Sequence, residues 1–494
     1  MLTGAGHCLH GCNKRTHDPK PLTVKVSLME INSGDTAWVL VSAALVLLMT
    51  PGVALFYGGM VRAKSVLNMM MMMSFGAMAT ISVAWVLWGY SEAFGQSWHG
   101  LVGNPFQHFG LSNLLSGDKA VFGYVAAAAG APAHGGIPAM AFVAFQAVFA
   151  IITVALISGA IADRAKYSTW LVFTVVWATI VYFPVAHWVF AFNGFAADKG
   201  GWIANNLKTI DFAGGTAVHI NAGAAGLALA LILGKRIGFA KDPMRPHNMT
   251  LVMVGAGLLW FGWFGFNAGS ALGANNTAAV TWVNTLAATG AAAIAWLATE
   301  RIRNGHGTSL GAASGIVAGL VAITPACSSV TPLGAVSIGI LAGVLCALAV
   351  GLKFRLGFDD SLDVVGVHLV GGLVGTIAIG FFASASAPAA VDGLFYGGGL
   401  DQLWRQVVGA GAVLLYSFVV TGVIGLALHK ALGFRIEPDA EVSGIDLEEH
   451  AESSYDLGSL GGGGLRHAGA ASFGSHTATS SPSESKPNTQ GASS

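Results

Sequence analysis

The chain has 494 residues, of which 54% are hydrophobic and only 10% are charged, whereas an ordinary soluble protein has about 25% charged residues. This composition excludes an ordinary soluble protein and predicts a multi-pass membrane protein. The 24 lysines and arginines equal the 24 aspartates and glutamates, so no charge excess indicates a nucleic-acid partner.

Residues 1–35 form a polar N-terminal extension that is expected to be disordered. The stretch HCLHGC (7–12) has histidine and cysteine at metal-like spacing, but it lies in an unpatterned leader, and we expect no metal and no cofactor. No apolar signal-peptide core precedes Met29, so translation is expected to start at or near that residue.

Eleven candidate membrane spans follow, each with an apolar run of about 20 residues, enough for a hydrocarbon core of about 30 Å. They start near residues 36, 65, 138, 169, 212, 249, 276, 310, 333, 362 and 403. Alternate loops are rich in lysine and arginine, and the positive-inside rule makes these loops cytoplasmic. The N-terminus is then outside and the C-terminus inside, with a membrane domain over 36–432.

The apolar pattern stops after about residue 433. Residues 433–456 are acidic and mixed, which predicts a cytoplasmic segment that can be ordered. Residues 457–494 are rich in Gly, Ser and Thr and are expected to form a disordered tail.

Two histidines interrupt apolar spans in closely similar surroundings. VHINAGAAG around His219 and VHLVGGLVG around His368 both place small residues three, four and seven positions after the histidine. These spans are the fifth and the tenth, and a repeat of five helices (1–5 and 6–10) must be inverted across the membrane. The expected fold is an all-α membrane protein of eleven transmembrane helices, with an inverted five-helix repeat plus an eleventh helix.

At a rise of 1.5 Å per residue, both histidines fall near the middle of the membrane, where ionisable residues are functional by default. We predict that His219 and His368 face each other, line a pore and relay protons. Two charged rings would repel each other, so an uncharged pair that handles a small, proton-exchanging permeant is expected. Asp211 and Asp363, at the starts of the two helices, are expected to cap free backbone N–H groups.

Four motifs occur in a specific order: LMTPGVALFYGGMVR (48–62), DFAGGTAVHINAGAAG (211–226), WFGFNAGSA (263–271) and DVVGVHLVGG (363–372). With them, the sequence from about 36 to 456 resembles the ammonium transporter (Amt/Mep/Rh) family, and its bacterial Amt branch in particular. The resemblance implies a transporter, not an enzyme, that forms a homotrimer in membrane lipid, with one hydrophobic pore in each protomer. His219 and His368 match the twin pore histidines.

The resemblance also assigns roles at the outer end of the pore. Phe149 and Phe266 match the two phenylalanines that gate it, and an external ammonium recruitment site matches Ser270, Phe149, Phe190 and Asp211. Many members have Trp where this chain has Phe190, in AHWVF (186–190). Because Phe offers a weaker cation–π face than Trp, we expect ammonium recruitment with reduced affinity.

The family resemblance implies a mechanism and a regulator. Ammonium would lose its proton at the phenylalanine gate, ammonia would pass the histidines, and the proton would follow separately, so that uptake is electrogenic. The segment EVSGIDLEEHAESSYD (441–456), with Gly444, Asp446 and His450 at matched spacing, resembles the family's C-terminal region. That region implies coupling between protomers and a P-II-type (GlnK-like) regulatory protein at the cytoplasmic face.

Three alternatives remain beside this hypothesis. The first is an Rh-like electroneutral channel for ammonia or carbon dioxide, against which Ser270 and the C-terminal segment argue. The second is an ammonium sensor that signals through its C-terminal tail. The third is an intramembrane hydrolase that pairs Ser314 with a histidine, although no activated nucleophile or oxyanion hole is indicated.

Overall fold

The structure is a computed structural model that describes residues 31–116, 121–122, 136–195 and 197–455. Two compact units are distinguished, which end at Ser454 and Ser494, and of the second only Tyr455 is described. The predictions for the HCLHGC leader, for the start at Met29 and for the 457–494 tail therefore lie outside the described residues.

The regular secondary structure of the described residues is almost entirely helical, and ten segments are long and apolar enough to cross a membrane. These segments are Ser33–Met60, Val66–Phe94, Ala139–Ile161, Tyr167–Phe190, Gly215–Leu233, Met249–Gly269, Asn276–Asn304, Pro332–Leu356, Val365–Phe382 and Asp401–Leu432. An eleventh apolar helix, α11 (Ser309–Ile323), has 15 residues and is about 22 Å long, which is shorter than a hydrocarbon core. The predicted all-helical membrane fold is confirmed, and each predicted segment coincides with one of these helices.

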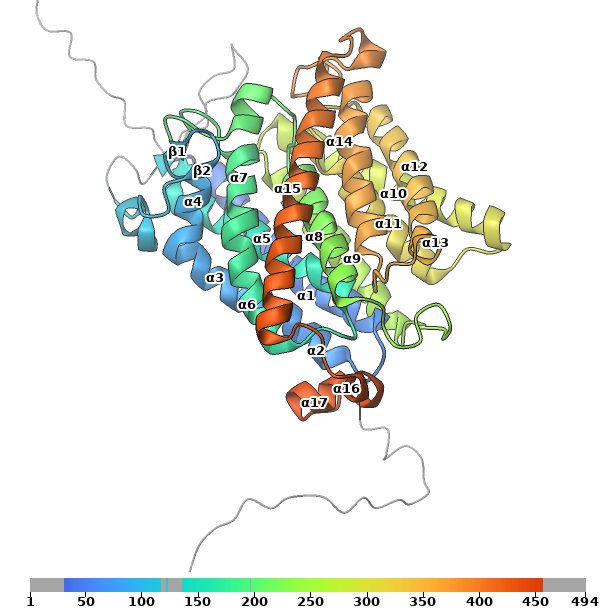
Figure 1. Ribbon diagram of the computed structural model, residues 1–494. Helices are drawn as coiled ribbons and strands as arrows, with labels where there is room; N and C mark the ends of the chain where they lie inside the picture. The colour runs from blue at the N-terminus through green and yellow to red at the C-terminus, as the bar shows by residue number, and fades with distance from the viewer. Residues whose placement is uncertain (1–30, 117–120, 123–135, 196, 456–494) are drawn as a thin grey trace, which may run out of the picture. The chain divides into compact units, whose positions relative to one another are not determined.

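Four of the segments are single helices, α1 (Ser33–Met60), α9 (Met249–Gly269), α10 (Asn276–Asn304) and α15 (Asp401–Leu432). The others join several elements: α2 (Val66–Met71), η1 (Met72–Ala79), α3 (Thr80–Ala84), η2 (Trp85–Gly89) and α4 (Tyr90–Phe94); α5 (Ala139–Ile157) and η5 (Ser158–Ile161); α6 (Tyr167–Trp177), η6 (Ala178–Tyr182) and α7 (Phe183–Phe190); η8 (Gly215–Ile220) and α8 (Asn221–Leu233); α12 (Pro332–Ala349) and α13 (Leu352–Leu356); η9 (Val365–Leu369) and α14 (Val370–Phe382). Figure 1 shows these helices as one bundle.

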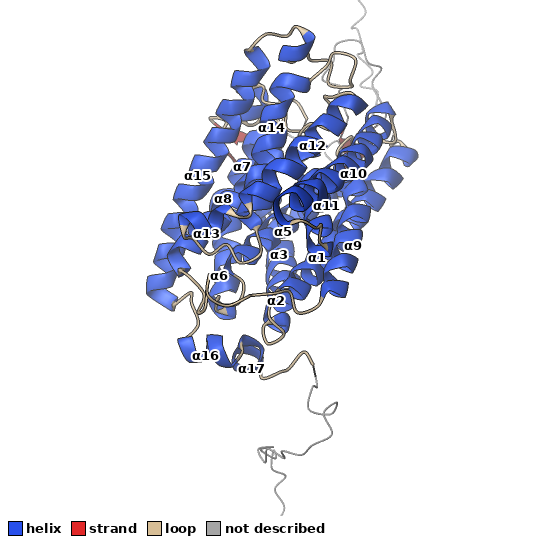
Figure 2. Cartoon of the chain, turned by 90° about the vertical axis from the view of Figure 1, so that its right-hand side faces the viewer, coloured by secondary structure: helices blue, strands red, loops and turns tan. Residues whose placement is uncertain are grey.

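Short elements occupy the connections between the membrane segments. They are the antiparallel pairs β1 (Ser97–Trp98) with β2 (Val102–Gly103) and β3 (Val121–Phe122) with β4 (Ile137–Pro138), and the helical turns η3 (Phe109–Leu114), η7 (Ile203–Leu207) and η10 (Leu394–Tyr396). After α15, α16 (Pro438–Ser443) and α17 (Ile445–His450) lie beyond the end of the bundle (Figure 2).

Glycines allow the helices to approach each other closely where they cross. A Cβ on Gly265 of α9 would lie 2.8 Å from the carbonyl oxygen of Ser42 in α1, so only glycine permits this approach of the two helices. In the same way, a Cβ on Gly223 of α8 would lie 2.5 Å from the backbone nitrogen of Leu369 in η9. Gly223 therefore brings the fifth and tenth segments into backbone contact, whereas Gly375, in the stripe after His368, packs against Ala322 of α11.

The segments that carry the two histidines share an uncommon backbone. Gly215–Ile220 (η8) and Val365–Leu369 (η9) are π-helical turns, and each continues as a regular α-helix. Single π-helical turns inside α-helices occur frequently at functional sites. Both histidines lie within these turns, which are two of the six π-helical segments in the described residues, so the two positions share the same local backbone as well as the same sequence pattern.

Candidate functional site

The side chains of the two predicted pore histidines meet inside the bundle. Nδ1 of His219 lies 3.3 Å from Nδ1 of His368, and the rings are stacked with their planes 15° apart. Both side chains are buried, with exposed fractions of 1% and 4%. The predicted pairing of His219 with His368 is thus confirmed by a direct hydrogen bond.

The Nε2 atoms of the two histidines, which take no part in the bond between the rings, have different surroundings. Nε2 of His219 is buried and has no hydrogen-bond partner among the described residues, whereas Nε2 of His368 lies 3.5 Å from the hydroxyl of Tyr57. The Tyr57 hydroxyl also lies 3.5 Å from the carbonyl oxygen of Leu156. When Tyr57 donates to His368 and not to Leu156, Nδ1 of His368 carries the hydrogen of the shared bond, and His219 presents an N–H group at Nε2. The pair can therefore offer a donor to a small molecule at His219.

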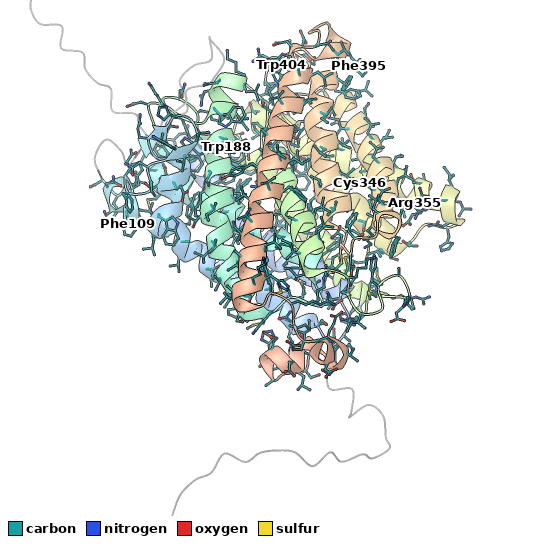
Figure 3. The ribbon with its side chains drawn as sticks, viewed as in Figure 1. Phe109, Trp188, Cys346, Arg355, Phe395 and Trp404 are labelled. Atoms are coloured by element: carbon teal, nitrogen blue, oxygen red, sulfur yellow. The ribbon has the colours of Figure 1, made fainter. Side chains whose placement is uncertain are left out.

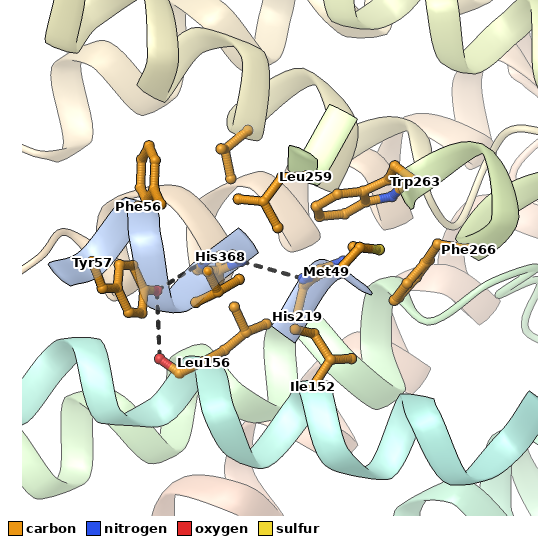
Figure 4. A pocket seen from close by; sticks show the side chains of 12 residues that line it. Met49, Phe56, Tyr57, Ile152, Leu156, His219, Leu259, Trp263, Phe266 and His368 are labelled. Atoms are coloured by element: carbon orange, nitrogen blue, oxygen red, sulfur yellow. Dashed lines mark hydrogen bonds between the residues drawn. The ribbon is translucent and has the colours of Figure 1, made fainter. Parts of the chain in front are cut away.

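An apolar cavity of about 10 Å³ adjoins the two histidines, room for about one water-sized molecule (Figure 4). It is lined by Met49, Val53, Phe56, Tyr57, Ile152, Leu156, His219, Leu259, Trp263, Phe266, Val317 and His368. Its walls carry few polar atoms apart from the imidazoles and the Tyr57 hydroxyl. An unpaired charge is costly in such surroundings, whereas a small neutral molecule fits.

Two aromatic rings, besides that of His368, stack on the imidazole of His219. The ring of Trp263 stacks on it at 5.4 Å and 16°, and Nε1 of Trp263 donates a hydrogen bond of 2.8 Å to Oγ1 of Thr324. Phe266 stacks on the same imidazole at 5.9 Å. Our sequence reasoning missed Trp263 as a site residue, although it lies three residues before Phe266 in the quoted WFGFNAGSA motif.

Two phenyl rings separate this cavity from a larger one. The ring centroids of Phe149 and Phe266 lie 4.3 Å apart, and the two side chains are 1% and 0% exposed. Phe266 lines the small cavity, and Phe149 lines the larger one. This contact is the arrangement expected of a gate.

The larger cavity, which we call the vestibule, has a volume of about 750 Å³. It is lined by Phe142, Phe145, Gln146, Phe149, Phe190, Phe192, Asn193, Gly194, Phe195, Ala204, Asn205, Lys208, Asp211, Phe212, Ser270 and Leu272. All four residues expected at an external recruitment site are in this set. Oγ of Ser270 donates a hydrogen bond of 2.8 Å to the carbonyl oxygen of Phe266 and so connects the vestibule to the gate.

Phe190, and not Trp188, is the aromatic residue of AHWVF that reaches the vestibule. Trp188 is labelled in Figure 3. Its Nε1 donates a hydrogen bond of 2.6 Å to the carbonyl oxygen of Leu101, and its ring packs at 4.7 Å from that of Tyr416. Trp188 is thus held in the packing between α7 and α15. The vestibule has a phenyl face and no indole N–H at this position.

Asp211 caps the start of η8, as predicted. Its carboxylate accepts hydrogen bonds from the backbone nitrogens of Gly214 (2.8 Å), Gly215 (2.6 Å), Thr216 (2.7 Å) and Ala217 (3.2 Å), and from the Thr216 hydroxyl. These donors occupy both carboxylate oxygens. Asp211 therefore acts as the cap of η8, and both of its carboxylate oxygens are engaged by this role.

The corresponding prediction for Asp363 is wrong. Asp363 has a left-handed backbone (φ +64°) and forms an ion pair of 2.7 Å with Lys353. The cap is Asp360, whose carboxylate accepts from the nitrogens of Val364 (3.0 Å) and Val365 (2.7 Å). Asp360 lies eight residues before His368, the spacing that Asp211 has from His219, and this equal spacing is the signal that our sequence comparison overlooked.

Buried ion pairs surround this second helix start. Arg236 contacts Asp359 at 2.9 Å and Asp163 at 3.1 Å. Burial opposes the ionisation of Asp359, but the Arg236 guanidinium outweighs it and holds the pKa of Asp359 below its ordinary value. For Asp360, burial dominates over the attraction of Lys353 and raises the pKa to about 6.

The segment after α15 contacts the ends of two membrane helices. The buried carboxylate of Asp446 accepts hydrogen bonds from the nitrogens of Leu67 (3.0 Å) and Asn68 (2.8 Å) at the start of α2. Nε2 of His450 lies 3.0 Å from Oδ1 of Asn68, and Glu449 accepts from the nitrogen of Tyr167 at the start of α6. This acidic segment supplies, from a distant part of the chain, caps that the local sequence lacks.

The remaining candidate, Ser314, lies on α11 and is 8% exposed. Within the described ranges it forms no hydrogen bond with either histidine; the recorded partners of the pair are the other histidine and, for His368, Tyr57. The geometry gives no support to a serine–histidine hydrolase.

An apolar cavity with a histidine pair, beside two stacked phenyl rings inside a bundle of membrane-length helices, defines the class as a multi-pass membrane protein with a buried site for a small molecule. Residues 37–455 match the family described as the Ammonium Transporter Family. The chain is 62% identical over 435 residues to an ammonium transporter of Mycobacterium tuberculosis (strain H37Rv), a match that covers 86% of this chain and 91% of the relative. The chain therefore belongs to the ammonium transporter family.

Solved structures have the same fold. A structure titled "Sensor Amt Protein" matches with a TM-score of 0.74 and 28% identity, over 84% of this chain and 98% of that one. The crystal structure of Saccharomyces cerevisiae Mep2 matches with a TM-score of 0.71 and 34% identity, over 83% and 89% of the two chains.

Proposed function

We propose that this protein is an ammonium transporter of the cytoplasmic membrane. The observation that carries the proposal is the hydrogen-bonded pair of His219 and His368 beside an apolar cavity with room for about one water-sized molecule. Ammonia has about this size, donates and accepts hydrogen bonds, and exchanges protons, so it suits a pair of neutral imidazoles.

The proposed path begins in the vestibule, where Ser270 and the phenyl face of Phe190 recruit the ammonium ion. Moving the bare ion through an apolar pore carries an idealised cost on the order of 20 kcal/mol, so it gives up its proton near Phe149 and Phe266. Neutral ammonia then passes His219 and His368. The proton follows separately through the paired rings, which makes uptake electrogenic.

We further propose eleven transmembrane helices in an inverted five-helix repeat, with the N-terminus outside and the C-terminus inside. The equivalent π-helical turns η8 and η9, each preceded by an aspartate cap eight residues before its histidine, support the repeat. The lysine- and arginine-rich loops support the orientation.

The proposed assembly is a homotrimer, in which residues 433–456 couple the protomers and receive a P-II-type regulator at the cytoplasmic face. The contacts of Asp446 and His450 with Asn68 support a regulatory role, because they connect this segment to the end of a membrane helix. A partner that moves the segment would alter the start of α2.

Charge translocation tests the proposal. The purified protein in liposomes on a solid-supported membrane is pulsed with ammonium, for the wild type, His219→Ala and His368→Ala. A saturable inward current that both variants lose is expected. The absence of current beside rapid internal alkalinisation would contradict electrogenic uptake and favour neutral gas conduction, and the absence of both would contradict transport.

A further inference from the structure

Lys208 has a fixed position at the wall of the vestibule, three residues before Asp211. Its backbone φ of +59° lies in the left-handed region, which is uncommon for a residue with a side chain. Hydrogen bonds on both sides hold it there: Arg405 donates to the carbonyl oxygen of Leu207 (2.9 Å), and the Thr209 hydroxyl donates to that of Arg405 (3.0 Å). The segment is thereby clamped to α15.

Two residues of opposite charge line the vestibule, and Lys208 is the exposed one of the two. Among the described residues that line it, only Lys208 and Asp211 are charged. Asp211 is 7% exposed and its carboxylate is occupied by helix-start donors, whereas Lys208 is exposed and forms no ion pair within the described part of the chain. The neighbouring acid Asp401, at the start of α15, forms an ion pair of 2.9 Å with Arg405 and interacts with Lys208 electrostatically, without direct contact.

A positive charge at the wall of the vestibule opposes the arrival of a cation. Two like unit charges about 10 Å apart in water change a local ion concentration by about twofold, and the effect fades when the Debye length falls from about 30 Å at 0.01 M salt to about 3 Å at 1 M. Asp211 carries the opposite charge but is nearly buried, and the other groups lining the vestibule are neutral, so Lys208 is the exposed charge of this lining.

We propose that Lys208 is a specificity-determining residue of the vestibule, which repels the ammonium ion and raises the ammonium concentration at half-saturation. The inference rests on the proposed function, because it concerns the ion that the vestibule recruits. Lys208 acts on the charged form of the substrate and leaves the passage of neutral ammonia through the histidine pair unchanged.

The test compares Lys208→Gln and Lys208→Glu with the wild type, in ammonium concentration series on a solid-supported membrane at about 0.01 M and about 0.5 M sodium chloride. Lys208→Gly, which fits a positive φ without strain, is a third variant that removes the charge. The matched control is Lys199→Glu, an exposed lysine of the same outer connection that does not line the vestibule.

At low salt, the half-saturating ammonium concentration is expected to fall about twofold in Lys208→Gln and Lys208→Gly and about fourfold in Lys208→Glu, with an unchanged maximal current. At high salt, these differences are expected to shrink below about 1.5-fold, and the control is expected to match the wild type throughout. Equal half-saturation in all proteins at low salt, or an equal shift in the control, would overturn the role of Lys208. Loss of current in every protein, the wild type included, would instead overturn the proposed function.

Discussion

Nδ1 of His219 lies 3.3 Å from Nδ1 of His368, and only one of the two nitrogens can carry the hydrogen of the bond between them. The tautomer of one ring therefore fixes that of the other, and the pair acts as a unit. We expect His219→Ala, His368→Ala and the double variant to lower the ammonium-driven current by a similar factor of at least about ten. Currents at matched protein density measure this, and a double-variant loss equal to the product of the single losses would show independent roles.

Phe190→Trp is expected to improve recruitment, because an indole ring attracts a cation more strongly than a phenyl ring does. An exposed cation–π contact contributes about 0.5–1 kcal/mol, so the half-saturating ammonium concentration should fall by at most about fivefold. Ammonium concentration series of the current measure it. Trp188→Phe serves as the control, since Trp188 does not line the vestibule. An unchanged half-saturation in Phe190→Trp would remove Phe190 from the recruitment site.

Asp211→Ala is expected to destabilise the protein by about 3 kcal/mol, because it leaves several buried N–H groups of η8 without an acceptor. Thermal unfolding in detergent measures the loss, and Asp211→Asn, which keeps one acceptor oxygen, should lose less. The exposed Asp198→Ala on the same outer connection should change stability by less than about 0.5 kcal/mol. A melting temperature of Asp211→Ala equal to that of the control would refute the capping role.

Asp360 is expected to make stability depend on pH. Its folded pKa of about 6 lies above the ordinary value of 3.8, so the folded protein binds this proton more tightly than the unfolded chain does. Its contribution is present in full below pH 3.8 and is lost as the pH rises to about 6, by at most about 3 kcal/mol. The melting temperature of the wild type relative to Asp360→Asn should thus fall between pH 4 and pH 6 and stay level above. A constant difference across this range would contradict the raised pKa.

Asp446→Asn is expected to loosen the start of α2, because its carboxylate accepts from the nitrogens of Leu67 and Asn68. Hydrogen exchange of the amides in 66–71 should become several-fold faster, since the local opening free energy falls by about 1 kcal/mol. The exposed neighbour Glu448→Gln, with the same loss of charge, should leave these amides unchanged. Identical exchange in both variants would show that Asp446 does not hold the helix start.

The sequence predicted the helical segments well because an apolar run that can span a bilayer is a local property. Each of the eleven predicted segments is an apolar helix, although α11 is shorter than a full span. The two histidines were found because small residues recur at the same offsets after each of them. The choice of Asp363 failed because its side chain pairs with Lys353, whereas the eight-residue spacing from the histidine, shared with Asp211, would have indicated Asp360.

By itself, the sequence determined the membrane class, the apolar helices and the two histidines, since hydrophobicity and residue spacing are properties of the linear sequence. The tertiary structure decided the contacts between segments distant in sequence. Tyr57 reaches His368, Trp263 stacks on His219, and both depend on the helix crossings that closely packed glycines permit. The same holds for Lys208, whose place in the vestibule is set by its hydrogen-bonded clamp to α15. Such contacts arise from packing geometry, which a linear pattern does not encode.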